Sequence, residues 1–122
     1  MSAKLALTIG AVAAAVFGLA LLLLPQQMLA GFGLEAPAAA QVVSRDVGVT
    51  LLGLAVLNWR ARDATGTTLR AILIANLFIQ VAELVVNGVE IATGVLPGQA
   101  APGLLIHLVL AVIFVLPLRN TI

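Results

Sequence analysis

The sequence predicts an all-α membrane protein, an antiparallel bundle of four transmembrane helices with both termini in the cytoplasm. The chain has 122 residues, of which 62% are hydrophobic and only 9% are charged, whereas soluble domains are roughly 45–50% apolar. It also contains four stretches long enough to provide the roughly 20 apolar residues that one crossing of a bilayer needs. We expect residues 1–122 to form a single membrane domain, with short joints between the helices.

The first predicted helix covers residues 4–24 and carries no charge after Lys4. It should stop before Pro25, because proline lacks an N–H and disfavours helical geometry in the preceding residue. The apolar run exceeds the roughly 7–15 residues of a signal-peptide core, so we expect it to be retained. One face should pack closely against another helix, because it repeats a small side chain every fourth residue: Ala6, Gly10, Ala14 and Gly18.

The other predicted helices cover residues 39–59, 68–95 and 103–119, the last in spite of Pro117. Gly, Pro or clustered polar residues occupy the joints between them, as is typical of turns. The joint at residues 26–38 mixes large apolar side chains with glycines. We expect it to serve as a connector at the membrane surface, with partial folding over the bundle as the alternative.

The orientation follows from the cations, since short cytoplasmic loops are enriched in Lys and Arg. With four crossings, both termini and the middle loop lie on the same side. Five of the six cations fall on that side, which we therefore expect to be cytoplasmic: Lys4, Arg60, Arg62, Arg70 and Arg119. Arg45 is the exception.

A polar stripe runs along the third predicted helix, at steps of 4, 3, 4 and 3 residues: Asn76, Gln80, Glu83, Asn87 and Glu90. Ionisable groups inside a membrane are rare, face the protein interior and usually serve function. Asn76 and Gln80 are expected mainly to hold helices together by hydrogen bonds. For Asn87 the structural and functional interpretations are about even, and Glu83 is expected to serve a ligand, ion or proton.

Counting about 1.5 Å per residue from the cytoplasmic cations places Glu83 at the same depth as three residues of other helices, about 18–23 Å in. Those residues are Arg45, Asp46 and His107. A polar pocket in the outer half of the bundle is therefore predicted. Its expected ligand- or proton-binding residues are Glu83, Arg45, Asp46, His107, Asn87, Glu90 and Gln80.

An unpaired charge in hydrocarbon costs about 2.5–3.5 kcal/mol, so a partner is expected for each buried ion. Depth favours an ion pair between Arg45 and Glu83. Arg45 could equally serve as a ligand-binding group, because its guanidinium also suits a carboxylate or phosphate. His107 is expected more as a hydrogen-bonded bundle residue than as a base.

Several classes of chemistry have no support in the sequence. The absence of cysteine excludes disulfides and thiolate metal sites. No phosphate-binding glycine loop, nucleophile elbow or metal-ligand spacing occurs, so no catalytic residue, metal or cofactor is expected. The net charge of +1 and the scattered positions of the cations argue strongly against a nucleic-acid partner.

A resemblance to a known family rests on several features of the chain. They are the span ended by Pro25, the Gly-Phe-Gly turn at residues 31–33 and the stretch RDVGVTLLGLAVLNWRARD, which contains Arg45, Gly48, Gly53 and Trp59-Arg60. In this layout the chain resembles small bacterial four-helix membrane proteins, broadly DoxX-like. The resemblance implies a fold and transfers no function. We expect a multi-pass protein of the cell membrane, in the bacterial inner membrane.

Three functions are compatible with these observations. The first is a transporter-like or accessory protein that binds protons or a small amphipathic or cationic ligand, with Glu83 as the key group. The second is an assembly subunit whose polar stripe meets a partner's transmembrane helix, or a second copy of the chain. The third is an acid-base enzyme that acts on a lipid or isoprenoid through Glu83, Asp46 and His107.

Overall fold

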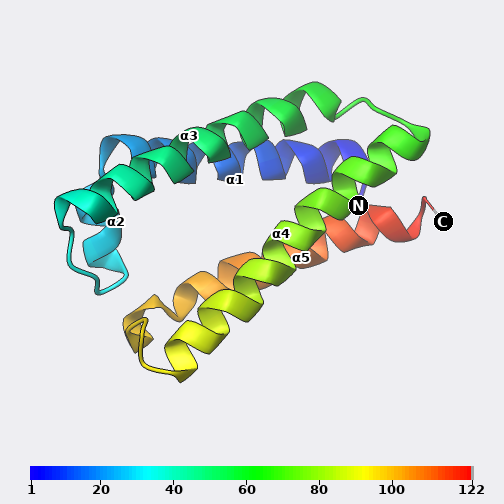
Figure 1. Ribbon diagram of the computed structural model, residues 1–122. Coiled ribbons are helices and arrows are strands. Elements are labelled where there is room, and N and C mark those ends of the chain that lie inside the picture. Colours follow the sequence, from blue (N-terminus) through cyan, green and yellow to red (C-terminus); the bar gives the residue numbers. More distant parts are fainter. Residues whose placement is uncertain (122) are drawn as a thin grey trace.

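The computed structural model describes residues 1–121, and within this range it is built of helices without strands. Four helices are long and apolar enough to cross a membrane, which confirms the predicted helical class. In order, the elements are α1 (Ala3–Leu23), α2 (Pro25–Gly31), α3 (Ala38–Ala61), α4 (Gly66–Ala92), the 3-10 turn η1 (Gly98–Ala100) and α5 (Pro102–Arg119) (Figure 1). The bounds of the long helices lie within three residues of the expected ones.

A short helix, α2, lies inside the stretch expected as a connector. Pro25 both follows the end of α1 and opens α2, since proline is tolerated in the first turn of a helix. The chain then turns at Gly33, whose φ of +76° is a conformation that favours glycine. This turn directs the chain toward Pro37, which precedes α3.

The four long helices form two pairs. Figure 1 shows α1 beside α3 and α4 beside α5, and the two pairs approach each other at one end of the molecule and separate toward the other. We call the end that carries both termini and the α3–α4 loop the inner end. The opposite end, which carries α2 and η1, is the outer end.

Glycines hold α1 against α3. A Cβ atom at Gly48 would lie 2.7 Å from the carbonyl oxygen of Gly18, and one at Gly18 would lie 2.8 Å from the carbonyl oxygen of Gly48. Neither position therefore has room for a side chain. The row of small residues on α1 is buried throughout, which confirms it as a packing face: Ala6, Gly10, Ala14 and Gly18. Close backbone approach is what favours helix association where lipid is as apolar as the side chains.

The two pairs meet in a small apolar core near the inner end, made by Leu7, Leu73 and Phe114 together with neighbouring buried residues. Phe114 is only 1% exposed. Its ring lies over Gly10, where an added Cβ would be 2.6 Å from the Phe114 Cζ atom. We call this core, with the amide pair described below, the inner junction.

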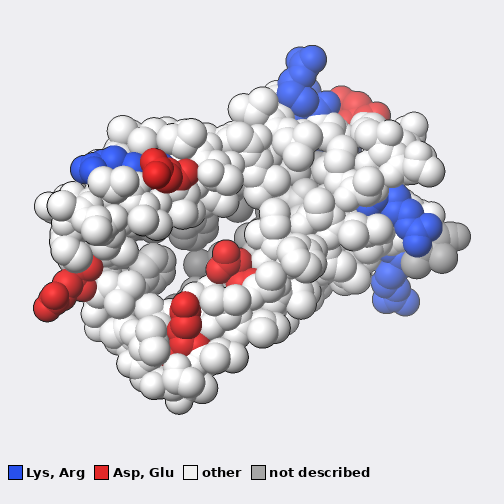
Figure 2. Space-filling model, viewed as in Figure 1, with Lys and Arg blue, Asp and Glu red and all other residues white. Residues whose placement is uncertain are grey.

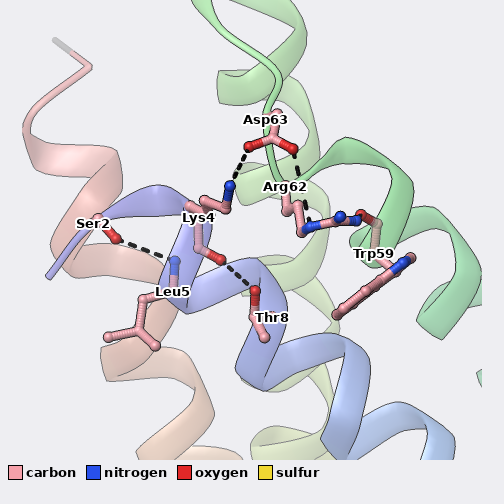
Figure 3. A network of polar contacts seen from close by, with 7 residues as sticks. All are labelled: Ser2, Lys4, Leu5, Thr8, Trp59, Arg62 and Asp63. Atoms are coloured by element: carbon pink, nitrogen blue, oxygen red, sulfur yellow. Dashed lines mark hydrogen bonds and ion pairs between the residues drawn. The ribbon is translucent and has the colours of Figure 1, made fainter.

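A polar network closes the surface of the inner end (Figure 3). Lys4 Nζ lies 2.8 Å from Asp63 Oδ1 and so ties the start of α1 to the α3–α4 loop. The Arg62 guanidinium lies 3.9 Å from the centroid of the Trp59 ring, within the range of a cation–π interaction. The hydrogen bond from Lys4, reinforced by the charges of Lys4 and Arg62, lowers the pKa of Asp63.

Candidate functional site

A cavity of about 370 Å³ lies between the two helix pairs, in the half of the molecule where they separate. Its walls on the side of α1 and α3 are apolar. Phe17 and Leu21 come from α1, and Val47, Leu51 and Leu54 come from α3 at spacings of four and three residues. That spacing gives α3 one apolar face toward the cavity.

The opposite wall is polar because the predicted stripe on α4 faces the cavity. All five stripe residues line it: Asn76, Gln80, Glu83, Asn87 and Glu90. His107 of α5 joins them. Of the seven residues expected at a site, the fold thus gathers five around one space.

The two carboxylates on this wall have few partners. Asn87 Nδ2 donates a hydrogen bond to Glu83 Oε2 at 3.0 Å. For the Glu90 carboxylate, no hydrogen bond or ion pair occurs within residues 1–121. Seven residues separate the two side chains, which places them about 10 Å apart along the helix. Glu83 is exposed and Glu90 is half-buried.

Gln80 and His107 join α4 to α5 beside the cavity. His107 Nδ1 lies 2.8 Å from Gln80 Oε1. Because an amide oxygen only accepts, His107 Nδ1 is the donor in this contact. Gln80 is buried and His107 is half-buried. The expected role of Gln80 in holding helices together has a contact to support it.

Asn76 forms a reciprocal amide pair with a residue that the sequence reasoning missed, Asn58 of α3. Asn58 Nδ2 donates to Asn76 Oδ1 at 2.9 Å, and Asn76 Nδ2 donates to Asn58 Oδ1 at 2.8 Å. Asn76 Nδ2 also donates to the Ile72 carbonyl oxygen at 2.9 Å. Both side chains are at most 1% exposed. The pair links α3 to α4 at the inner limit of the cavity.

The sequence of α3 contains a pattern from which the pairing of Asn58 could have been predicted. Asn58 shares one buried face with Ser44, Gly48 and Ala55, which are all small residues of the kind that packs against a neighbouring helix. A large amide at the end of such a face needs a polar partner, because burying an unpaired amide is costly.

Arg45 and Asp46 do not lie where the sequence analysis predicted them. Neither lines the cavity, and both are exposed. Arg45 Nη2 donates to Gln41 Oε1 at 3.4 Å along its own helix. The expected ion pair between Arg45 and Glu83 is therefore wrong. Counting residues gives the depth of a side chain but not the direction in which it points around the helix axis, and the separation of the pairs adds distance between α3 and α4.

The outer end of the cavity is covered by α2, the turn after it and η1. Apolar side chains of this cover line the cavity: Met28, Phe32, Leu34, Leu96 and Ala100. Gln99 Nε2 donates to the carbonyl oxygens of Ala30 and Gly31, both at 3.3 Å. These hydrogen bonds connect the outer ends of the two helix pairs. The stretch at residues 26–38 thus folds partly over the bundle, which was the alternative to a plain surface connector.

At its inner end the cavity stops at Phe114 and Asn76, which line it and are themselves almost fully buried. To the side, it opens between α3 and α4. These two helices touch little along their length, and the space-filling view shows a hollow on this face, with acidic groups at its margin (Figure 2). Between its two covered ends, the cavity thus opens to the side through the gap between α3 and α4.

The charge around the cavity is entirely negative. Glu83 and Glu90 line it, whereas none of its lining residues is Lys or Arg. No group of three or more His, Asp or Glu side chains within the described part of the chain could hold a metal ion. An arrangement of this kind can accept a molecule with an apolar body and a hydrogen-bonding or positively charged end.

Comparison with known proteins finds no matching family model, no matching curated protein and no matching solved structure. The DoxX-like resemblance therefore stays a prediction.

Proposed function

We propose that the protein is an integral membrane protein that binds a small amphipathic molecule in the cavity between its two helix pairs. The observation that carries this proposal is that the polar stripe of α4 lines a cavity of its own chain, where its carboxylates have few protein partners. Polar groups that served only to hold helices together would be expected to contact one another, as Asn58 and Asn76 do.

The character of the cavity supports a small organic ligand. Ligand sites usually measure about 300–1,000 Å³ and are mostly apolar, with a few polar groups that orient the ligand. This cavity lies at the lower end of that range, at about 370 Å³. Its apolar α1 and α3 walls would hold the body of the ligand, and the α4 wall would hold its polar end, with Glu83 as the principal group.

We further propose an antiparallel four-span insertion with the inner end in the cytoplasm. Lys4, Arg60 and Arg62 flank the inner ends of α1 and α3, as the positive-inside rule requires. The cavity then lies in the outer half of the membrane. With the DoxX-like resemblance, this orientation favours the bacterial inner membrane and a transporter-like or accessory role.

The two other functions compatible with the sequence gain less support. An acid-base enzyme using Glu83, Asp46 and His107 would need the three groups together, and Asp46 does not line the cavity. An assembly subunit would need its polar stripe available to a partner helix, and the stripe faces the chain's own cavity.

Filling the cavity tests the proposal. Gly103 lines the cavity, and a Cβ there would meet nothing within 4 Å. A side chain at this position starts in open space beside the cavity, so we expect Gly103→Leu to reduce the cavity volume. Gly53→Leu is the matched control, because a Cβ at Gly53 also meets nothing within 4 Å but Gly53 does not line the cavity.

The measurement is methyl NMR in lipid nanodiscs, titrated with dodecylamine, dodecanol or dodecanoate. We expect at least one of these to shift the methyl signals of Leu51 and Leu104 saturably, with the exposed Val12 as an internal reference for general partitioning into the lipid. The shifts should disappear in Gly103→Leu and persist in Gly53→Leu. If none of the three amphiphiles produces shifts that depend on Gly103, the proposed function is wrong.

A further inference from the structure

We infer that the ligand is a lipophilic amine in its ammonium form, and that it reaches the cavity from the membrane through the gap between α3 and α4. This inference rests on the proposed function and adds the charge of the ligand and its route. Three features of the molecule carry it: the charge of the lining, the covered ends of the cavity and the position of Glu83.

The first feature is uncompensated negative charge. Glu83 and Glu90 line the cavity without a lining cation, and the ion pairs of residues 1–121 lie elsewhere, between Asp63 and its neighbours Lys4 and Arg62. Carboxylates removed from water are costly unless they are paired. An ammonium group carries one positive charge and three hydrogen-bond donors, so it complements a wall that offers mainly acceptors.

The second feature is that both ends of the cavity are covered. At the outer end, Gln99 bridges to the carbonyl oxygens of Ala30 and Gly31 across an apolar cover. At the inner end, Phe114 and the pair of Asn58 with Asn76 fill the space between the helix pairs. Neither aqueous side therefore has a direct path to the ligand.

The third feature is the gap between α3 and α4, together with the position of Glu83 beside it. Val47 and Leu51 line the cavity from α3, and Ile79 and Glu83 line it from α4. Apart from Glu83 this margin is apolar, which suits passage from a lipid environment. Val47 and Glu83 both line the cavity and are both exposed, as side chains at the margin of an opening would be. The hollow on this face is visible in Figure 2.

These features together define a binding mode. The apolar body of the amine lies against Phe17, Leu21 and Leu51, and its ammonium group binds Glu83, which keeps its hydrogen bond from Asn87. Glu90 lies two residues before the end of α4, near the outer boundary of the membrane. There it adds negative charge along the same wall and favours cations over anions.

The charge of the ligand is tested by comparing three amphiphiles of equal chain length in nanodiscs at pH 7. We expect dodecylamine to bind about tenfold more tightly than dodecanol, a difference that corresponds to about 1.4 kcal/mol, and dodecanoate to bind most weakly. Glu83→Gln should reduce the affinity for dodecylamine to that for dodecanol. Glu35→Gln removes an exposed acid that does not line the cavity, and it should leave all three affinities unchanged.

The outcomes of this comparison separate the inference from the proposed function. The inference of a cationic ligand is wrong if dodecanol or dodecanoate binds as tightly as dodecylamine, or if Glu83→Gln leaves the preference for dodecylamine intact. In either case the proposed binding in the cavity stands. Retained methyl signals of the inner junction in Glu83→Gln serve as the check that the variant is folded.

The route is tested by exchange kinetics. Val47→Trp should narrow the gap and slow association and dissociation of dodecylamine by similar factors, because a barrier on the route affects both directions. Val49→Trp, on an exposed position of α3 that does not line the cavity, should change neither rate. Gln99→Ala should also leave both rates unchanged. If Gln99→Ala accelerates exchange and Val47→Trp does not slow it, the ligand passes the outer cover and the proposed route is wrong.

Discussion

The inner junction and the outer cavity both contain polar residues of α4, but these residues have different partners in the two places. At the inner junction, Asn76 meets Asn58 in a buried reciprocal pair. In the outer half, Glu83 has one amide partner on its own helix, and Glu90 has none within the described residues. The difference arises because the helix pairs touch at one end and separate at the other. Whether a polar residue in a membrane helix is structural thus depends on the nearness of the next helix.

The packing explains why the contact is confined to the inner end. Gly10 of α1 leaves space for the Phe114 ring of α5, so the two pairs come close there. Farther out, the glycines that permit close approach, Gly18 and Gly48, join α1 to α3 within one pair. The outer halves of the two pairs are instead connected by the hydrogen bonds of Gln99. We therefore expect the inner junction to hold the two pairs together, while the outer half contains the cavity for which we propose a binding role.

The largest effect on stability is expected from Phe114→Ala. The ring is almost fully buried between the two pairs, and truncating a buried Phe costs about 3–5 kcal/mol. Reversible unfolding in bicelles would measure the loss. Val112→Ala, on an exposed position of the same helix, should change stability by less than about 0.5 kcal/mol. Equal losses in the two variants would show that the inner junction does not dominate stability.

A smaller loss is expected from Gly48→Ala. The new Cβ would collide with the backbone oxygen of Gly18, and overpacking of this kind costs about 1–3 kcal/mol. The same unfolding assay applies. Gly53→Ala, where the added Cβ meets nothing within 4 Å, should be neutral or slightly stabilising, since Ala favours a helix by about 1 kcal/mol over Gly. Destabilisation by both variants would contradict a specific contact between Gly18 and Gly48.

The amide pair predicts a non-additive result. Asn76→Leu leaves Asn58 buried without its partner, and should cost about 1–2 kcal/mol, since a buried unsatisfied group costs about 1–3 kcal/mol in general and less inside membranes. Replacing both residues by Leu should be closer to neutral than either single change. A double-mutant cycle on unfolding free energies measures the coupling. Additive losses would mean that the two amides do not act as a pair.

Glu83→Gln should separate stability from binding. Because the hydrogen bond described for the Glu83 side chain comes from Asn87 of its own helix, we expect the unfolding free energy of this variant to stay within about 0.5 kcal/mol of that of the original protein. Binding of dodecylamine should fall. Asn76→Leu, in contrast, should lower the free energy of unfolding. A large stability loss in Glu83→Gln would place this carboxylate among the structural polar groups.

The smallest effect is expected at the surface of the inner end. The pKa of Asp63 is lowered from 3.8, chiefly by its hydrogen bond with Lys4. A carboxyl group whose pKa falls on folding stabilises the protein above its unfolded pKa, and this contribution is lost as the pH falls through the folded value. Asp63→Asn should therefore lower stability slightly at pH 7 and by less at pH 3, where part of this contribution is already lost. An equal effect at both pH values would exclude the charge of Asp63 as its cause.

Several features of the fold could be predicted from local patterns. Pro25 marks the end of α1, and the row of small residues marks its packing face. The steps of 4, 3, 4 and 3 residues bring the stripe of α4 onto one wall, because helical periodicity alone determines which residues share a face. These features depend on neighbours in the chain.

Other features could not be predicted because they depend on how separate helices meet. Depth counting placed Arg45 beside Glu83, but Arg45 does not line the cavity and donates a hydrogen bond to Gln41. Asn58 gained its importance only from the approach of Asn76. The hydrogen bonds that join the end of α2 to η1 likewise come from Gln99, which lies far along the chain.

The sequence by itself thus determined four membrane-length helices, the small-residue face of α1 and the polar face of α4, because hydropathy and periodicity are local properties. The tertiary structure alone decided that the helices pair two by two and separate at the outer end. Asn76 lies where the pairs approach and has a hydrogen-bond partner on α3, whereas Glu83 lies where they separate and has little protein contact. A hydrogen bond between helices requires the donor and acceptor atoms to lie within about 3 Å of each other, and only the packing of the helices sets that distance.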